Sequence, residues 1–199
     1  MLDRHVNQFF LPALEIICKK IRHVGIGANW ITFLGLVFAF TVLLALSFGY
    51  FYLGLFFLVL NRICDGLDGC LARLEGSTSF GGFIDIVFDF VFYSFVPLGF
   101  AIYSENNYFA SVILLTAFYI NGGTFLAFSS IVTKDCKDIN YGKKGIYYSV
   151  GLIEGTETAI FFSLFCLFPL HYSVLVYIFA GLTLVTAINR IKLAANILS

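Results

Sequence analysis

The stretch VGIGANWITFLGLVFAFTVLLALSFGYFYLGLFFLVLN, residues 24–61, carries no charged side chain. A helix needs about 20 apolar residues to cross the roughly 30 Å hydrocarbon core of a bilayer. The stretch is therefore long enough for two crossings, which an aromatic turn around Phe48–Tyr52 separates. It predicts a pair of membrane-spanning helices.

The composition extends this prediction to the whole chain. Of the 199 residues, 60% are hydrophobic and 12% are charged, and the mean hydropathy is +0.93. Soluble domains carry about 25% charged residues. This composition argues against a disordered chain, a disulfide scaffold, a nucleic-acid-binding protein and an ordinary soluble domain.

Further uncharged runs predict an all-α polytopic membrane protein, with one domain over residues 1–199. The six predicted spanning helices cover residues 30–49, 51–73, 82–104, 107–132, 146–168 and 171–190. Residues 1–24 differ, because apolar side chains such as Phe10, Leu14 and Ile17 alternate with basic ones at roughly helical spacing. This segment predicts an amphipathic helix that lies in the headgroup region of the membrane.

The basic residues predict the orientation. All 12 Lys and Arg side chains fall at or near one side of the six-helix arrangement, whereas the other side keeps only Glu105 and His171. Because cytoplasmic loops carry an excess of Lys and Arg, both termini are expected in the cytoplasm.

Four aspartates lie near the predicted cytoplasmic side of the second and third helices. Asp65 and Asp68 are three residues apart and share a helix face, as do Asp85 and Asp89, four residues apart. The short loop at 74–80 makes the two helices adjacent and antiparallel, so the carboxylates lie at one depth. Carboxylates so placed are costly unless cations bind them, and oxygen ligands suit Mg²⁺ or Mn²⁺.

Small residues and an arginine accompany the aspartates. Gly69 and Ala72 leave one helix face bare, and Gly81 lets a ligand approach the backbone of the next helix. Arg73 offers a planar guanidinium that suits a phosphate group. Two bound metal ions beside an arginine are typical of phosphoryl transfer.

The signature over residues 65–89 resembles that of the CDP-alcohol phosphotransferases, also called CDP-alcohol phosphatidyltransferases. Its residues are Asp65-x-x-Asp68-Gly69-x-x-Ala72-Arg73 and then Gly81-x-x-x-Asp85-x-x-x-Asp89. Asn29-Trp30-Ile31-Thr32 is similar to the family's P-N-x-x-T element, with Ala28 in the place of proline. The chain as a whole is similar to bacterial inner-membrane members of the family.

The resemblance implies a transferase of phospholipid biosynthesis. It would move a phosphatidyl or other substituted phosphate group from a CDP-alcohol, usually CDP-diacylglycerol, to a small polar alcohol, with release of CMP. The implied cofactors are two Mg²⁺ or Mn²⁺ ions, held by Asp65, Asp68, Asp85 and Asp89, with Asp89 as a metal ligand, the general base or both. The implied donor-binding residues are Asn29, Thr32, Gly69, Ala72, Arg73 and Gly81. The resemblance also implies a homodimer whose active site faces the cytoplasm.

The sequence is also compatible with other roles for these residues. The four aspartates are also compatible with a proton or cation pathway in a small transporter or a non-catalytic protein. Asn29 and Thr32 are compatible with a role as caps of the first spanning helix. For an enzyme of this family, the candidate acceptors are glycerol 3-phosphate, serine and inositol phosphate. Phe90, where glycerol-phosphate-using members often carry lysine, weakens the first candidate, and Pro97 resembles the serine-using group.

Three more charged residues are candidates for the acceptor site. Arg62 either binds an anionic group of the acceptor or extends toward the headgroups. Glu154 and Glu157 lie inside the fifth predicted helix and either contact the acceptor or pair with Arg62 or Lys143.

Overall fold

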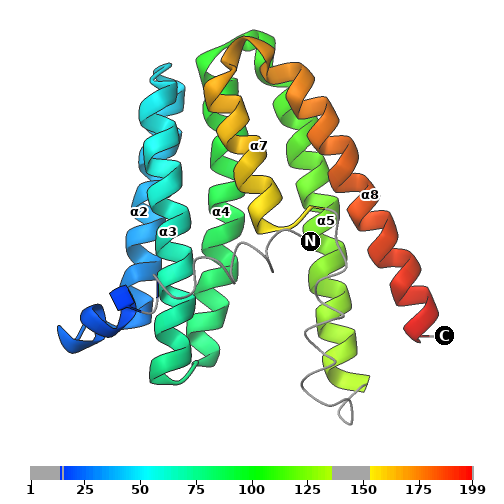
Figure 1. Cartoon of the computed structure of the whole chain (residues 1–199). Coiled ribbons are helices and arrows are strands. Elements are labelled where there is room, and N and C mark those ends of the chain that lie inside the picture. Colours follow the sequence, from blue (N-terminus) through cyan, green and yellow to red (C-terminus); the bar gives the residue numbers. More distant parts are fainter. Residues whose placement is uncertain (1–13, 15, 136–152, 199) are drawn as a thin grey trace.

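The computed structural model describes residue 14 and residues 16–135 and 153–198 (Figure 1). Every regular element within these ranges is helical, which confirms the all-α prediction. The long helices are α2 (Ala28–Ser47), α3 (Phe51–Glu75), α4 (Ser79–Tyr103), α5 (Tyr108–Asp135), α7 (Gly155–Leu167) and α8 (Tyr172–Leu198). Two 3₁₀ turns, η1 (Glu105–Asn107) and η2 (Pro169–His171), connect α4 to α5 and α7 to α8.

Within the described residues, four helical segments are long and apolar enough to cross a membrane, by length and composition. They are Ala28–Ser47, Ser79–Tyr103, Glu105–Ile131 and Pro169–Ile197. Helix α3 has 25 residues, enough to span about 30 Å at about 1.5 Å per residue, but it carries several charges. Helix α7 has 13 residues. The predicted count of six is reached only if α3 and α7 also cross.

Most predicted helix positions agree with the structure, and the fifth does not. Helix α7 begins at Gly155, and residues 153 and 154, which the prediction of a helix over 146–168 includes, are not helical. Residues 146–152 lie outside the described part of the chain. Helix α8 continues to Leu198, past the predicted end at 190. Arg190 and Lys192 end the uncharged run on which the prediction depended, but the helix itself continues through them. Of the predicted interfacial helix over 1–24, residues 16–23 are helical, and most of the remainder lies outside the described residues.

The helices run up and down, so that three connections lie at one end of the bundle: residues 48–50, η1 and η2 (Figure 1). Helix α2 packs on α3 and α4, α5 packs on α8, and α7 contacts α3. Glu105 and His171 lie at the end with the three connections, as the charge pattern predicts. Arg62 departs from this pattern, because it lies near the middle of α3 and not at a helix end.

Aromatic side chains form the core that fixes α4 against the C-terminal helices. The ring of Phe100 in α4 stacks on Tyr172 of α8 with centroids 4.2 Å apart, and the Tyr172 hydroxyl hydrogen-bonds Ser111 of α5 over 2.8 Å. Between α4 and α5, Gly122 allows close approach, since a Cβ atom there would lie 2.4 Å from the Phe90 ring. These contacts hold α4, which carries two of the four aspartates, in place.

Candidate active site

A tight connection between α3 and α4 brings the signature residues together. Gly76 ends α3 with a φ of 95°, a left-handed conformation that glycine adopts without strain. Thr78 caps α4, where its hydroxyl accepts a hydrogen bond from the Gly81 amide over 3.0 Å. The last turns of α3 therefore lie beside the first turns of α4, as the short loop predicts.

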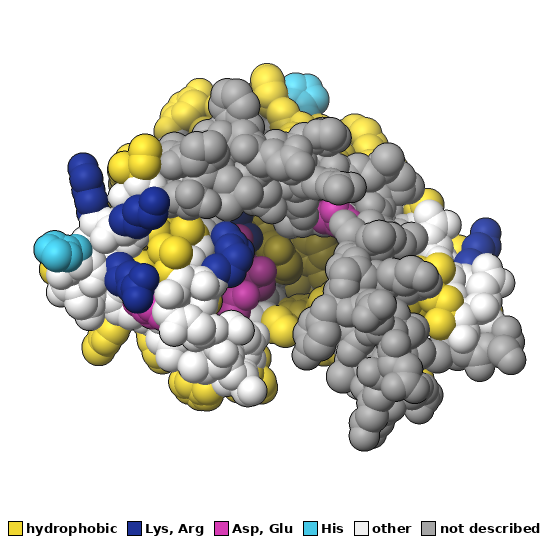
Figure 2. All heavy atoms as spheres, turned by 60° about the horizontal axis from the view of Figure 1, so that its bottom comes forward, with side chains coloured by type: hydrophobic (Ala, Val, Ile, Leu, Met, Phe, Trp, Pro, Cys, Tyr) yellow, Lys and Arg dark blue, Asp and Glu magenta, His cyan; other side chains and the backbone are white. Residues whose placement is uncertain are grey.

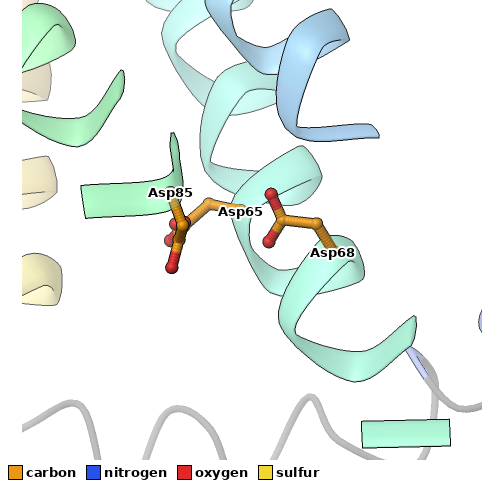
Figure 3. Close-up of side chains that lie close together, drawn as sticks. All are labelled: Asp65, Asp68 and Asp85. Carbon is orange, nitrogen blue, oxygen red and sulfur yellow. The ribbon is translucent and has the colours of Figure 1, made fainter. Parts of the chain in front are cut away.

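Three of the four aspartates converge across this helix pair (Figure 3). One carboxylate oxygen from each of Asp65, Asp68 and Asp85 lies within 4.8 Å of the other two. Asp68 is buried, whereas Asp65 and Asp85 are half-buried. This all-oxygen ligand set from two rigid helices fits the coordination chemistry of Mg²⁺ or Mn²⁺.

Asp89 lies one helical turn beyond Asp85 and is bound differently. Its Oδ1 accepts a hydrogen bond from Arg62 Nη2 over 2.9 Å. A cavity of about 20 Å³ is lined by all four aspartates and by Arg62, and we call it the aspartate junction. The four carboxylates thus share one junction, within which Arg62 hydrogen-bonds Asp89 and lies 3.5 Å from a carboxylate oxygen of Asp65.

A cleft of about 690 Å³ opens on the loop side of the aspartate junction. Asp68 and Asp85 form part of its wall, and Figure 2 shows acidic and basic side chains beside a hollow on this face of the bundle. All six residues that the family resemblance assigns to the donor line the cleft: Asn29, Thr32, Gly69, Ala72, Arg73 and Gly81. We call it the donor cleft.

Asn29 and Thr32 do not cap α2 through their side chains, so the capping alternative is wrong. Helix α2 begins after Gly27 without a side-chain cap, and the Thr32 hydroxyl donates to the Ala28 carbonyl over 3.2 Å. Asn29 instead faces α4, since a Cβ atom at Gly81 would lie 3.1 Å from its Oδ1. Glycine at 81 therefore lets the two helix starts approach at the donor cleft.

A second cavity, of about 430 Å³, lies on the other side of Asp89. Its polar lining comes from separate parts of the bundle: Asp89 of α4, Asn121 of α5, Glu154 before α7, Thr158 of α7 and Arg190 of α8. Aromatic rings of Phe90, Tyr93, Phe118 and Phe125 complete the wall. Asp89 lines both this cavity and the aspartate junction, so it stands between the two.

Arg190 and Asn121 are site candidates that the sequence did not reveal. Arg190 is 8% exposed, and its Nη1 donates to the Asn121 carbonyl and side-chain oxygens over 2.9 and 2.8 Å and to Thr124 Oγ1 over 3.0 Å. One guanidinium nitrogen thus anchors the side chain to α5. The only signal in the sequence is a single arginine that ends a long uncharged run.

The prediction that Glu154 lies inside a spanning helix is wrong. Glu154 is the N-cap of α7 and forms a capping box with Glu157, whose Oε2 accepts from the Glu154 amide over 3.1 Å. The box satisfies backbone N–H groups that the start of a helix leaves without partners. Glu154 also lines the second cavity, whereas Glu157 is not among the lining residues.

Arg62 does not extend toward the headgroups. Its Nε and Nη2 donate to Asn61 Oδ1 over 2.9 and 2.6 Å, and its guanidinium lies 4.3 Å from the centre of the Phe92 ring. The structure therefore places this candidate acceptor residue inside the bundle and against Asp89.

Comparisons with known proteins agree with this geometry. The model of the CDP-alcohol phosphatidyltransferase family matches residues 26–189, a range that includes the four aspartates, the lining of the donor cleft and every lining residue of the second cavity except Arg190. The chain is 39% identical over 193 residues to the inner membrane protein YnjF of Escherichia coli (strain K12). The aligned region covers 96% of this chain and 94% of that protein. No solved structure matches the chain. The chain belongs to the CDP-alcohol phosphatidyltransferase family.

Proposed function

We propose that the protein transfers a phosphatidyl group from CDP-diacylglycerol to a small polar alcohol and releases CMP. The observation that carries this proposal is that the donor cleft and the second cavity both adjoin the aspartate junction, the first through Asp68 and Asp85 and the second through Asp89. The donor cleft contains the six family donor residues, the aspartate junction follows, and the second cavity lies beyond it. A donor phosphate and an acceptor hydroxyl would meet at this junction.

Asp65, Asp68 and Asp85 would hold one divalent cation, and Asp89 would contribute to a second. Bound Mg²⁺ or Mn²⁺ stabilises the negative charge that develops on the diphosphate during substitution. The three converging carboxylates supply the negative charge and the oxygen atoms that such ions prefer.

The side chains of the junction have distinct roles in this proposal. Asp89 accepts the proton of the acceptor hydroxyl, whose oxygen forms a new bond to the phosphorus atom on the lipid side of the diphosphate. The bond from that phosphorus to the bridging oxygen breaks, and its electron pair leaves with CMP. Arg73, in the donor cleft, binds the diphosphate with its planar guanidinium.

The second cavity is the proposed acceptor site. Its volume of about 430 Å³ lies within the usual range for small-molecule sites, and Asp89 borders it. Arg190 would bind an anionic group of the acceptor, and Glu154 would contact a hydroxyl or amino group. Arg190 and Glu154 would therefore hold an acceptor that carries an anionic group and a hydroxyl or amino group, close to the proposed base Asp89.

The membrane setting follows from the same proposal. The lipid donor enters sideways from the bilayer, while its nucleotide stays at the surface on which the basic residues gather. By the positive-inside rule this surface, with both termini and the donor cleft, faces the cytoplasm of an inner membrane. We also propose a homodimer, on the basis of family resemblance.

Removal of divalent cations should stop the reaction. The protein in liposomes with CDP-diacylglycerol and a mixture of glycerol 3-phosphate, serine and inositol phosphate should release CMP with Mg²⁺ or Mn²⁺, and EDTA should abolish the release. Mass spectrometry quantifies the CMP released under each condition. Proton or cation flux across the liposomes without CMP release would support a transporter and contradict the proposal.

Replacement of Arg190 should weaken the acceptor and not the donor. In Arg190→Gln the KM for the acceptor should rise by about tenfold or more, because a charged hydrogen bond contributes roughly 1.5–3 kcal/mol, whereas the KM for CDP-diacylglycerol should stay the same. Lys192→Gln is the matched control, because Lys192 is exposed and lies outside the cavity. Steady-state kinetics with each substrate varied would show the difference; a raised donor KM would argue against this site.

A further inference from the structure

A chain of hydrogen bonds connects α2 to α4 through the middle of α3. Asn61 Nδ2 donates to the Gly35 carbonyl of α2 over 2.8 Å, and Asn61 Oδ1 accepts twice from Arg62. Arg62 Nη2 then donates to Asp89 of α4 over 2.9 Å. Three helices are therefore joined by polar contacts that end on the proposed base.

Arg62 contacts an aromatic ring and a second carboxylate in addition to Asn61 and Asp89. Its guanidinium packs on the Phe92 ring, and its Nη1 lies 3.5 Å from Asp65 Oδ2. An arginine near the middle of a membrane helix is costly unless it is paired. The planar fork of arginine can bond Asn61 and Asp89 at the same time, which the single ammonium group of lysine does less well.

The contacts of Asp89 show what Arg62 can control. Asp89 borders the aspartate junction on one side and the second cavity on the other. Arg62 binds its Oδ1, so that Oδ2 is the oxygen left for a proton or a metal ion. Without Arg62 the carboxylate would be free to rotate, and the other three carboxylates of the junction would repel it.

The structure assigns Arg62 as a positioning residue that fixes Asp89, with one oxygen held and the other presented to the acceptor hydroxyl. This role rests on the proposed function, because it needs Asp89 to take the proton of the acceptor. Arg62 does not line the donor cleft, and the second cavity excludes it as well. Arg62 does line the aspartate junction, where it contacts Asp89 and Asp65, and in this inference it acts through Asp89.

A double-mutant cycle tests this role. In Arg62→Gln, kcat should fall by about 10²-fold, near the lower end of what general-base catalysis contributes, while the KM for CDP-diacylglycerol should change by less than about threefold. Arg62→Gln in an Asp89→Asn background should cost little further activity, because position 89 then has no carboxylate to orient and only the longer 3.5 Å contact of Arg62 with Asp65 remains. Arg62→Lys should recover part of the rate, since it retains the charge.

Two readouts separate positioning from general damage to the fold. Thermal unfolding of the wild type, the two single variants and the double variant should show coupling. Each single variant breaks the 2.9 Å Arg62–Asp89 pair and leaves one of its two charges in place, so the double variant should lose less stability than the two singles together. Arg190→Gln provides the kinetic contrast, because it should raise the acceptor KM instead of lowering kcat.

The possible outcomes distinguish this inference from the proposed function. Losses in kcat that multiply in the double variant, or additive losses of stability, would overturn the role of Arg62. A wild-type protein that releases no CMP with any of the three acceptors would overturn the proposed function. The unfolding cycle would then still decide whether Arg62 and Asp89 interact.

Discussion

Asp85→Asn should abolish CMP release while the protein still inserts into the membrane and folds. Asp85 is one of three carboxylates whose oxygens lie within 4.8 Å of one another, and the substitution removes a full negative charge from that group. A cation site built on three carboxylates loses a ligand of the type that Mg²⁺ requires. Neutralising a carboxylate in a membrane helix lowers the cost of insertion, so the protein level should not fall.

The measurement is CMP release together with the amount of protein in the membrane. Glu105→Gln is the matched control, because it neutralises an exposed carboxylate at the opposite end of the bundle. Its rate should equal that of the wild type. Substantial CMP release by Asp85→Asn would remove Asp85 from the metal site.

Asp89→Asn should lower turnover by about 10²–10⁴-fold, the usual contribution of general-base catalysis. Asparagine has nearly the same shape as aspartate but cannot accept the proton of the acceptor hydroxyl. If Asp89 is chiefly the base, donor and metal affinity should stay near those of the wild type. If it is chiefly a ligand of the second metal, metal affinity should fall together with the rate.

Metal titrations of donor binding and of activity distinguish these two cases. We favour a combined role, because a carboxylate that binds a metal through one oxygen can accept a proton through the other. Near-wild-type turnover at saturating metal would exclude both roles. The loss of the Asp89 charge also removes the closer of the two carboxylate partners of Arg62, so unfolding should be measured in parallel.

The helices and the donor cleft were predictable because their signals are local in the sequence. Uncharged runs give the spanning segments, and the i,i+3 and i,i+4 spacings place the aspartates on facing sides of two adjacent helices. A short loop between Arg73 and Gly81 leaves little freedom in how those helices meet. The signature therefore contains most of the geometry of the donor cleft.

The second cavity was not predictable, because it is built from residues far apart in the chain. Arg190 and Asn121 are 69 positions apart, and only the packing of α8 on α5 brings them together. Glu154 was misplaced because a glutamate inside an apolar run resembles a buried ligand, while its spacing to Glu157 also fits a helix cap. The pairing of Arg62 with Asp89 was not predictable either, because it depends on how α3 is rotated about its axis relative to α4.

We propose that a new phosphodiester lipid and CMP are made together at the aspartate junction. The most direct test reconstitutes the protein in liposomes that contain CDP-diacylglycerol, supplies the three acceptors with Mg²⁺ or Mn²⁺, and quantifies CMP and the new lipid by mass spectrometry. We predict that the two products appear in equal amounts and that Asp85→Asn forms neither. CMP without a matching lipid would indicate hydrolysis instead of transfer, and the absence of both products would contradict the proposed function.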